Sequence, residues 1–182
     1  MAAPIRTPKS AWIEAGLGAL ADGGPDAVRI DPLAKALGVT RGGFYWHFDD
    51  RQTLLVEMLD SWERAAIDEV LERVERRGGG PRLKARRAGA LTLSEELLPV
   101  DLAVRDWARR DPSVADHLQR VDNRRMEYLR TQFRAICSNQ DEVEARCLIA
   151  FSLLIGSHLI TAEHGGRSRE DVVATAARWL LA

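Results

Sequence analysis

A cluster of hydrogen-bond donors occupies residues 40–51 of this 182-residue chain. Its members are Thr40, Arg41, Tyr45, His47 and Arg51. An arginine can donate two hydrogen bonds to O6 and N7 of a guanine. Hydroxyl, imidazole and guanidinium groups can also donate to phosphate oxygens, and the methyl group of a threonine can contact that of a thymine. These residue types, gathered in one short segment, favour contact with DNA.

Two adjacent glycines, Gly42 and Gly43, lie inside this donor cluster. Each destabilises a helix by up to about 1 kcal/mol relative to alanine. A residue without a side chain also allows the backbone to approach another molecule closely. We therefore expect this glycine pair to bring the backbone close to DNA.

Two short predicted helices, residues 31–37 and 40–47, position these donors. They meet at Leu37-Gly38-Val39-Thr40, which has the length and glycine placement of a helix-turn-helix. A tight turn between helices favours a positive φ at Gly38, which glycine adopts without steric penalty. In such a motif the second helix enters the major groove with its first residues against base edges. Arg41 stands at that position and is expected to read a base.

Three residues of the same segment also have a structural interpretation. Phe48 is expected in the hydrophobic core, and Trp46 fits the core as well as a DNA-facing surface. A lone histidine such as His47 is often a structural polar group, although its ring N–H could equally donate to a phosphate.

Signals for helix starts recur along the chain, and no strand pattern is found. Thr7-Pro8, Asp31-Pro32 and Asp111-Pro112 each place a capping residue before a proline at the first helical position. The pairs Asp49/Gln52 and Ser168/Asp171 resemble capping boxes. We predict an all-α fold of about nine helices, near residues 8–22, 31–37, 40–47, 50–77, 82–97, 101–110, 112–136, 141–164 and 168–181.

The segment GVTRGGFYWHFDDRQTLL strongly resembles the signature of the tetracycline-repressor (TetR/AcrR) family of transcriptional regulators. The matching positions are Gly38, Val39, Thr40, Phe44, Tyr45, His47, Phe48, Arg51, Leu54 and Leu55. The resemblance is specific over roughly residues 10–60. Beyond them it depends on chain length and on the all-helical pattern.

The resemblance implies an N-terminal three-helix helix-turn-helix domain, residues 1–50, followed by a helical ligand-binding and dimerisation domain, residues 51–182. Helix 51–77 would connect the two. It further implies a homodimer that binds a pseudo-palindromic operator in double-stranded DNA and changes the separation of its two reading heads when a small molecule binds. By position, the DNA-facing candidates are Arg29, Thr40, Arg41, Gly42, Gly43, Tyr45, Trp46, His47 and Arg51. At Asp31-Pro32 the sequence departs from the family pattern, because some relatives carry a basic residue there that contacts DNA.

Charge in the chain is balanced, with a formal net charge of −1. Residues 1–51 contain as many acidic as basic side chains, so a DNA-facing surface must segregate its charge. We expect few phosphate contacts per protomer and a modest dependence of DNA binding on salt. Arg6 and Lys9 could reach a minor groove or form a solvated terminal segment. A basic cluster over residues 73–87 could be a solvated helix end or an accessory nucleic-acid contact.

The predicted helix 141–164 is apolar on nearly every face and must therefore bury two sides. We predict that it forms, with helix 168–181 and the same two helices of a second copy, a four-helix dimer interface. The expected interface residues are Phe151, Ile155, Leu159, Val172, Ala176 and Leu180. The alternative is one large core in a monomer.

A ligand pocket is expected among helices 82–136 and the inner face of helix 141–164. Its candidate lining residues are Trp107, Met126, Leu129, Phe133 and His158, each of which could instead simply belong to the core. This lining suits an apolar or aromatic effector with one or two polar contacts.

Catalytic and metal-binding patterns are missing from the sequence. It contains no metal-spaced set of His, Cys and Asp residues, no phosphate-binding glycine loop and no nucleophile elbow. We predict no enzyme activity, no metal and no cofactor.

The remaining sequence features concern the cellular compartment in which the protein is expected. Cys137 and Cys147 form no disulfide framework, and the N-terminus lacks the apolar region of a secretory signal. The apolar run from Cys147 to Ala162 is shorter than the roughly 20 residues of a membrane span. These features predict a cytoplasmic protein without a membrane partner.

The sequence as a whole predicts a ligand-responsive, sequence-specific transcriptional regulator, with a repressor that releases its operator as the favoured form. The alternative is a helical ligand-binding or interaction module without specific DNA binding.

Overall fold

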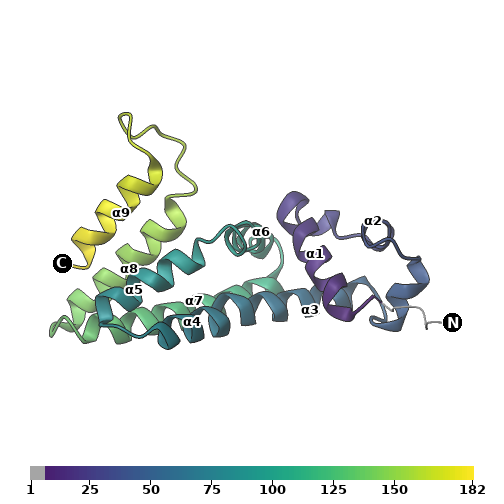
Figure 1. Cartoon of the computed structure of the whole chain (residues 1–182), viewed down its shortest axis with the longest axis horizontal. Coiled ribbons are helices and arrows are strands. Elements are labelled where there is room, and N and C mark those ends of the chain that lie inside the picture. Colours follow the sequence, from purple (N-terminus) through teal and green to yellow (C-terminus); the bar gives the residue numbers. More distant parts are fainter. Residues whose placement is uncertain (1–6) are drawn as a thin grey trace. The chain divides into compact units, whose positions relative to one another are not determined.

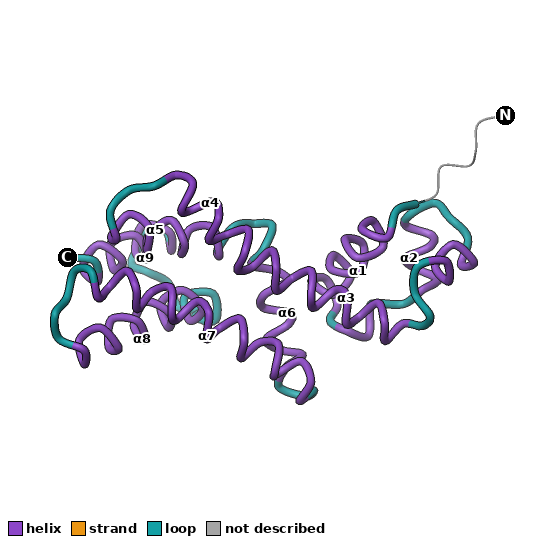
Figure 2. The backbone as a smooth tube through the Cα atoms, turned by 90° about the horizontal axis from the view of Figure 1, so that it is seen from below, coloured by secondary structure: helices purple, strands orange, loops and turns teal. Residues whose placement is uncertain are grey.

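The computed structural model describes residues 7–182, and within them it contains only helices, turns and loops (Figures 1 and 2). The α helices of this part are α1 (Lys9–Gly23), α2 (Ile30–Ala36), α3 (Arg51–Glu63), α4 (Val70–Arg77), α5 (Pro81–Thr92), α6 (Leu98–Ala108), α7 (Pro112–Arg134), α8 (Gln140–Gly156) and α9 (Arg169–Leu180). Shorter segments are the 3₁₀ helices η1 (Pro25–Ala27) and η2 (Arg41–Trp46) and the π-helical η3 (Arg64–Glu69). The predicted all-α fold is confirmed.

The chain divides into two compact units. The first contains the residues up to Glu69 together with Glu95–Val121, and the second contains Val70–Ser94 and Asp122–Ala182. The predicted connector helix 51–77 is the succession α3, η3 and α4, which passes from one unit to the other between Glu69 and Val70. The predicted functional boundary near residue 50 stays a prediction.

An aromatic cluster forms the core of the first unit. The ring of Phe44 lies 5.4 Å from that of Trp12 in an edge-on arrangement and 5.1 Å from that of Phe48 in a stacked one. All three side chains are fully buried, which confirms the predicted core position of Phe48. A Cβ at Gly16 would lie only 2.6 Å from the sulfur of Met58, which shows that α1 and α3 pack closely at this glycine. This core supports the helix-turn-helix from beneath.

Several helix starts depend on side-chain caps. The Oδ1 atom of Asp50 accepts a hydrogen bond of 2.7 Å from the backbone N–H of Thr53, which lowers the pKa of Asp50. At α9 the hydroxyl of Ser168 accepts one of 3.1 Å from the N–H of Asp171, as predicted. Asp50, and not the predicted Asp49, therefore caps α3.

The predicted cap at Asp31 is wrong. Helix α2 begins one residue earlier, at Ile30, so Asp31 lies inside the first turn and Arg29 takes the cap position without a side-chain bond. Thr40 likewise precedes η2 without capping it through its side chain.

Helix α8 is shorter than the predicted helix 141–164, since it ends at Gly156. The hydroxyl of Ser157 donates 3.1 Å back to the carbonyl of Leu154, and the next backbone bond, His158 N–H to Ile155 O, spans only three residues. Such side-chain bonds compete with the helical backbone pattern. The apolar run therefore continues beyond α8 as irregular chain.

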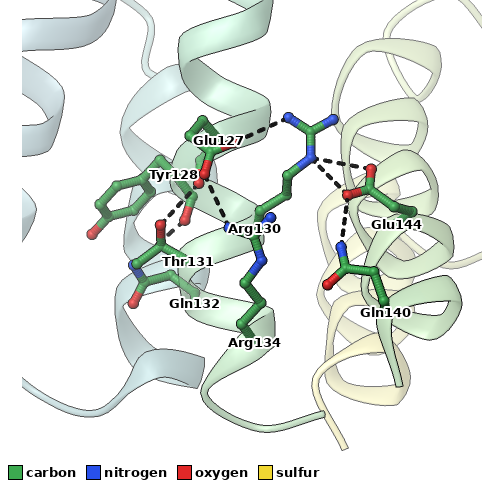
Figure 3. Close-up of polar contacts among 8 residues, drawn as sticks. All are labelled: Glu127, Tyr128, Arg130, Thr131, Gln132, Arg134, Gln140 and Glu144. Carbon is green, nitrogen blue, oxygen red and sulfur yellow. Dashed lines mark hydrogen bonds and ion pairs between the residues drawn. The ribbon is translucent and has the colours of Figure 1, made fainter. Parts of the chain in front are cut away.

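In the second unit, a small buried cluster of Phe133, Val143 and Cys147 joins α7 to α8. Arg130 of α7 donates from Nε to Glu144 of α8 at 2.8 Å, which also joins these two helices (Figure 3). Burial raises the pKa of Cys147 to about 11, so its thiol stays protonated at neutral pH. Across residues 7–182, no helix is both long and apolar enough to cross a membrane.

Candidate nucleic-acid interface and ligand cavity

The turn of the helix-turn-helix is built on Gly38, whose φ of 67° confirms the predicted left-handed conformation. Its N–H donates to the carbonyl of Lys35 at 3.1 Å, and the N–H of Val39 donates to that of Ala34 at 2.9 Å. These two bonds are the pair that closes a helix in a Schellman motif. They end α2 and direct the chain into η2.

The second helix of the motif, η2, is a single 3₁₀ segment and not the α-helix expected for residues 40–47. Its N–H groups donate to carbonyls three residues back, as in Gly43 to Thr40 and His47 to Phe44, both 2.9 Å. Two adjacent glycines are poor α-helix formers, which explains the tighter and shorter form.

The glycine pair of η2 has room for side chains inside the protein. A Cβ at Gly43 would lie 3.9 Å from the ring of Trp12, and one at Gly42 would lie 3.7 Å from the hydroxyl of Thr40. These are ordinary van der Waals distances, so neither glycine is required by internal packing. This observation supports the expected external role of the pair.

Six of the nine DNA-facing candidates are exposed. They are Arg29, Thr40, Arg41, Gly42, Tyr45 and Trp46. Trp46 exposes 70% of its side chain and Tyr45 50%, whereas their neighbours Phe44 and Phe48 are buried. Of the two interpretations of Trp46, the structure therefore supports the surface one.

Arg41 and Tyr45 are presented together. The Nη2 group of Arg41 donates to the Tyr45 hydroxyl at 3.2 Å, and Nη1 lies 3.6 Å from Oδ2 of Asp31. The hydrogen bond to Tyr45 and the charge of Asp31 both raise the pKa of Arg41. All three groups are exposed, so a base or phosphate could replace Asp31 beside the guanidinium at little cost.

Two other candidates make contacts inside the first unit. The Nε2–H of His47 donates to the carbonyl of Thr7 at 2.9 Å. Arg51 donates from Nε to the carbonyl of Val28 at 2.6 Å and from Nη2 to that of Pro25. Arg51 thereby ties the start of α3 to the α1–α2 connection. This structural role has no signal in the sequence, because its partners lie more than twenty residues away.

The N-terminal arm suggested by Arg6 and Lys9 can be described only in part. Lys9 forms an ion pair of 2.5 Å with Glu57 of α3. Arg6 lies outside the described residues.

The second unit contains a cavity of about 410 Å³ lined by α4, α5, α7, α8 and α9. Two predicted pocket residues, Leu129 and Phe133, line it. Among the described residues, the other three do not: Met126 packs against the Phe133 cluster, His158 follows the end of α8, and Trp107 is buried in the first unit. The lining residues of α5 were not predicted, and those of α9, such as Leu180, come from a helix that was expected at the dimer interface instead.

The predicted interface residues lie in different environments. Phe151 and Leu180 line the cavity, Ile155, Val172 and Ala176 are half-buried, and Leu159 is 69% exposed. Other large apolar side chains of the same region are exposed to a similar degree. They are Leu148, Ile149, Ile160 and Trp179.

Metal-binding side chains do not gather anywhere in residues 7–182 in groups of three or more that could hold an ion. The chemistry available at the exposed helix-turn-helix is hydrogen bonding and aromatic contact, and that of the cavity is apolar enclosure.

Similarity to solved structures extends over both units. A structure from Saccharomonospora viridis, described as a transcriptional regulator in complex with choline, has a TM-score of 0.79 and 17% identity over 94% of each chain. AibR, in complex with isovaleryl coenzyme A and operator DNA, has a TM-score of 0.68 and 14% identity over 95% of this chain and 97% of that one. The TetR family transcriptional regulator PfmR from Thermus thermophilus has a TM-score of 0.68 and 19% identity over 93% of this chain and 96% of that one.

A match in sequence to a family model covers the N-terminal region. No curated protein sequence is significantly similar to the chain. Residues 13–58, which include the whole helix-turn-helix, match the family model of the bacterial regulatory proteins of the tetR family. The N-terminal segment is therefore similar to the DNA-binding domain of this family, and the fold of the solved structures is shared along nearly the whole chain.

Proposed function

We propose that this chain is a transcriptional regulator that binds DNA sequence-specifically and responds to a small molecule. The observation that carries the proposal is the exposed surface of η2, where Arg41, Tyr45 and Trp46 project from a helix-turn-helix supported by a buried aromatic core. The cavity of the second unit supplies a site for the small molecule. AibR, which shares the fold, was solved with both an acyl coenzyme A and operator DNA, which supports both parts of the proposal.

The regulator acts as a homodimer on a pseudo-palindromic operator, since two copies related by a two-fold axis read two equivalent half-sites. Exposed apolar side chains on α8 and α9, among them Leu148 and Trp179, support an interface in this region. We further propose that the protein is a repressor without enzyme activity and that it acts in the cytoplasm, where its DNA is. Arg29, Thr40, Arg41, Tyr45 and Trp46 are the residues that we assign to DNA contact.

Selection of binding sites from random DNA tests this function. Ligand-stripped protein should enrich a two-fold-symmetric motif at low salt. Arg41→Ala should bind the selected site about 10- to 100-fold more weakly and tolerate several bases at one position of each half-site. A folded protein that enriches no motif would instead favour a ligand-binding module without specific DNA binding.

A further inference from the structure

The exposed residues that line the cavity mark its opening. On α5 they are Arg86 and Ala90, and on α9 they are Glu170, Ala174 and Arg178. Within each helix these positions are four residues apart, so they share one face. The other lining residues are buried or half-buried. The cavity of the second unit therefore opens to solvent between α5 and α9.

Two hydroxyl groups deeper in the cavity have hydrogen-bond partners within the protein. The hydroxyl of Thr92 donates to the carbonyl of Ala88 at 3.0 Å, and that of Tyr128 donates to Glu75 at 2.8 Å. The guanidinium of Arg125, 7% exposed, forms an ion pair of 3.8 Å with the carboxylate of Asp122. Most of the other enclosed side chains are Leu, Val, Phe and Ala. We therefore expect the enclosed part of a ligand to be largely apolar.

Charge at the opening is unequal. The exposed lining residues include two guanidinium groups, Arg86 and Arg178, and one carboxylate, Glu170. Guanidinium groups bind carboxylate and phosphate oxygens with paired, charge-assisted hydrogen bonds. An anionic group placed here would stay partly hydrated, so it would avoid the full desolvation cost of a buried ion.

We propose that the cavity binds an amphipathic organic anion, with its apolar body enclosed and its carboxylate or phosphate head at Arg86 and Arg178. The volume of about 410 Å³ lies within the range of about 300–1,000 Å³ that small-molecule sites occupy. The assignment rests on the proposed function, because it names the class of molecule to which the regulator responds.

Calorimetric titration of the ligand-stripped full chain, without DNA, tests this assignment. The probes share one alkyl chain and differ in the head group: decanoate, decyl phosphate, decanol and decyltrimethylammonium, all below their micelle concentrations. An anionic probe should bind at least about tenfold more tightly than the alcohol and the cation. The ratio of decanoate to decyl phosphate affinity identifies the preferred head. Equal or tighter binding of the alcohol or the cation, or no binding of any probe, would overturn the assignment.

A double variant and a control variant test where the anionic head group of the ligand binds. Arg86→Gln combined with Arg178→Gln should remove the preference for an anion, while decanol binding should change little, because both side chains are exposed. Arg76→Gln removes the same charge from α4 at an exposed position outside the cavity and should leave the preference intact. A preference that survives in the double variant contradicts the proposed head-group site.

The result of the calorimetric titration can be distinguished from the result of the DNA-site selection. Binding of an anion that leaves operator binding unchanged would argue against ligand-responsive regulation while leaving the ligand class in place. A clear operator motif without anion preference would overturn the ligand class alone.

Discussion

At the scale of single residues, the glycine pair of η2 combines a local cost with an external benefit. Gly42 and Gly43 weaken the second helix of the motif, and nothing inside the protein requires them, because a Cβ would fit at both positions. A backbone that must lie against DNA gives a physical reason for glycine at such a position.

Gly42→Ala tests this reason, because Gly42 is the exposed member of the pair. The variant should fold with an unchanged or higher melting temperature, since alanine improves the helix by up to about 1 kcal/mol. Its affinity for the operator should nevertheless fall about tenfold or more, because the methyl group would enter the protein–DNA contact. Thermal denaturation and a DNA titration measure the two effects. A variant that binds as tightly as the wild type would show that the backbone does not approach DNA at Gly42.

Arg51 is a cation that could either bind DNA or stabilise the first unit. It donates to the carbonyls of Val28 and Pro25 from the first turn of α3. Arg51→Lys keeps the charge but cannot form both bonds, so we expect a loss of about 1–3 kcal/mol in the free energy of unfolding. Urea unfolding measures it. Unchanged stability with weaker DNA binding would assign Arg51 to phosphate contact.

At the scale of elements, one carboxylate joins three helices of the second unit. Glu75 of α4 accepts hydrogen bonds from Tyr128 of α7, at 2.8 Å, and from Lys84 of α5. Tyr128 also lines the cavity, and α4 follows α3 and η3 without a loop. The bond from Tyr128 to Glu75 therefore joins two helices that both line the cavity, and one of them, α4, continues from the DNA-binding region.

Tyr128→Phe should weaken the response of the protein to its ligand. The ring remains in the cavity wall, so ligand and operator affinities measured separately should change by less than about threefold. The ligand-induced drop in operator affinity, a coupling of typically about 5- to 150-fold, should shrink because the wall no longer holds Glu75. Operator titrations with and without ligand measure the coupling. An unchanged coupling would exclude this contact from the response.

Stability at low pH reports on the same carboxylate. The hydrogen bonds from Lys84 and Tyr128 lower the pKa of Glu75. A lowered folded-state pKa means that the stabilisation is complete above the unfolded value of about 4.3 and is lost as the pH falls through the folded value. The melting temperature of the wild type should therefore exceed that of Glu75→Gln at pH 7, and the gap should close below about pH 4. A gap that persists in acid would show that the charge of Glu75 is not its cause.

At the scale of the whole molecule, the exposed apolar side chains of α8 and α9 bear on assembly. Ile149 exposes 56% of its side chain and does not line the cavity, whereas Phe151 does. Ile149→Glu should therefore convert the proposed dimer to a monomer without disturbing the ligand site. Sedimentation velocity gives the mass, and circular dichroism checks the helical content. A dimer that persists would place the interface on other residues.

Features that depend on near neighbours along the chain could be predicted from the sequence. The all-helical fold, the positive φ of Gly38, the cap at Ser168 and the burial of Phe48 follow from turn chemistry, capping and short-range periodicity. These interactions join residues only a few positions apart, so a short stretch of sequence contains all the residues that form each of them. The helix-turn-helix was predictable for the same reason.

Which side chains face the interior and which remain available to a partner became clear from the packing of the helices. Arg51 and His47 bond to carbonyls 23 to 40 residues distant, and the cavity collects residues from helices that are far apart in the chain. Exposure of Trp46 likewise depends on how η2 lies on the aromatic core. Such contacts arise from packing between elements, which leaves no periodic trace in the sequence of any one of them.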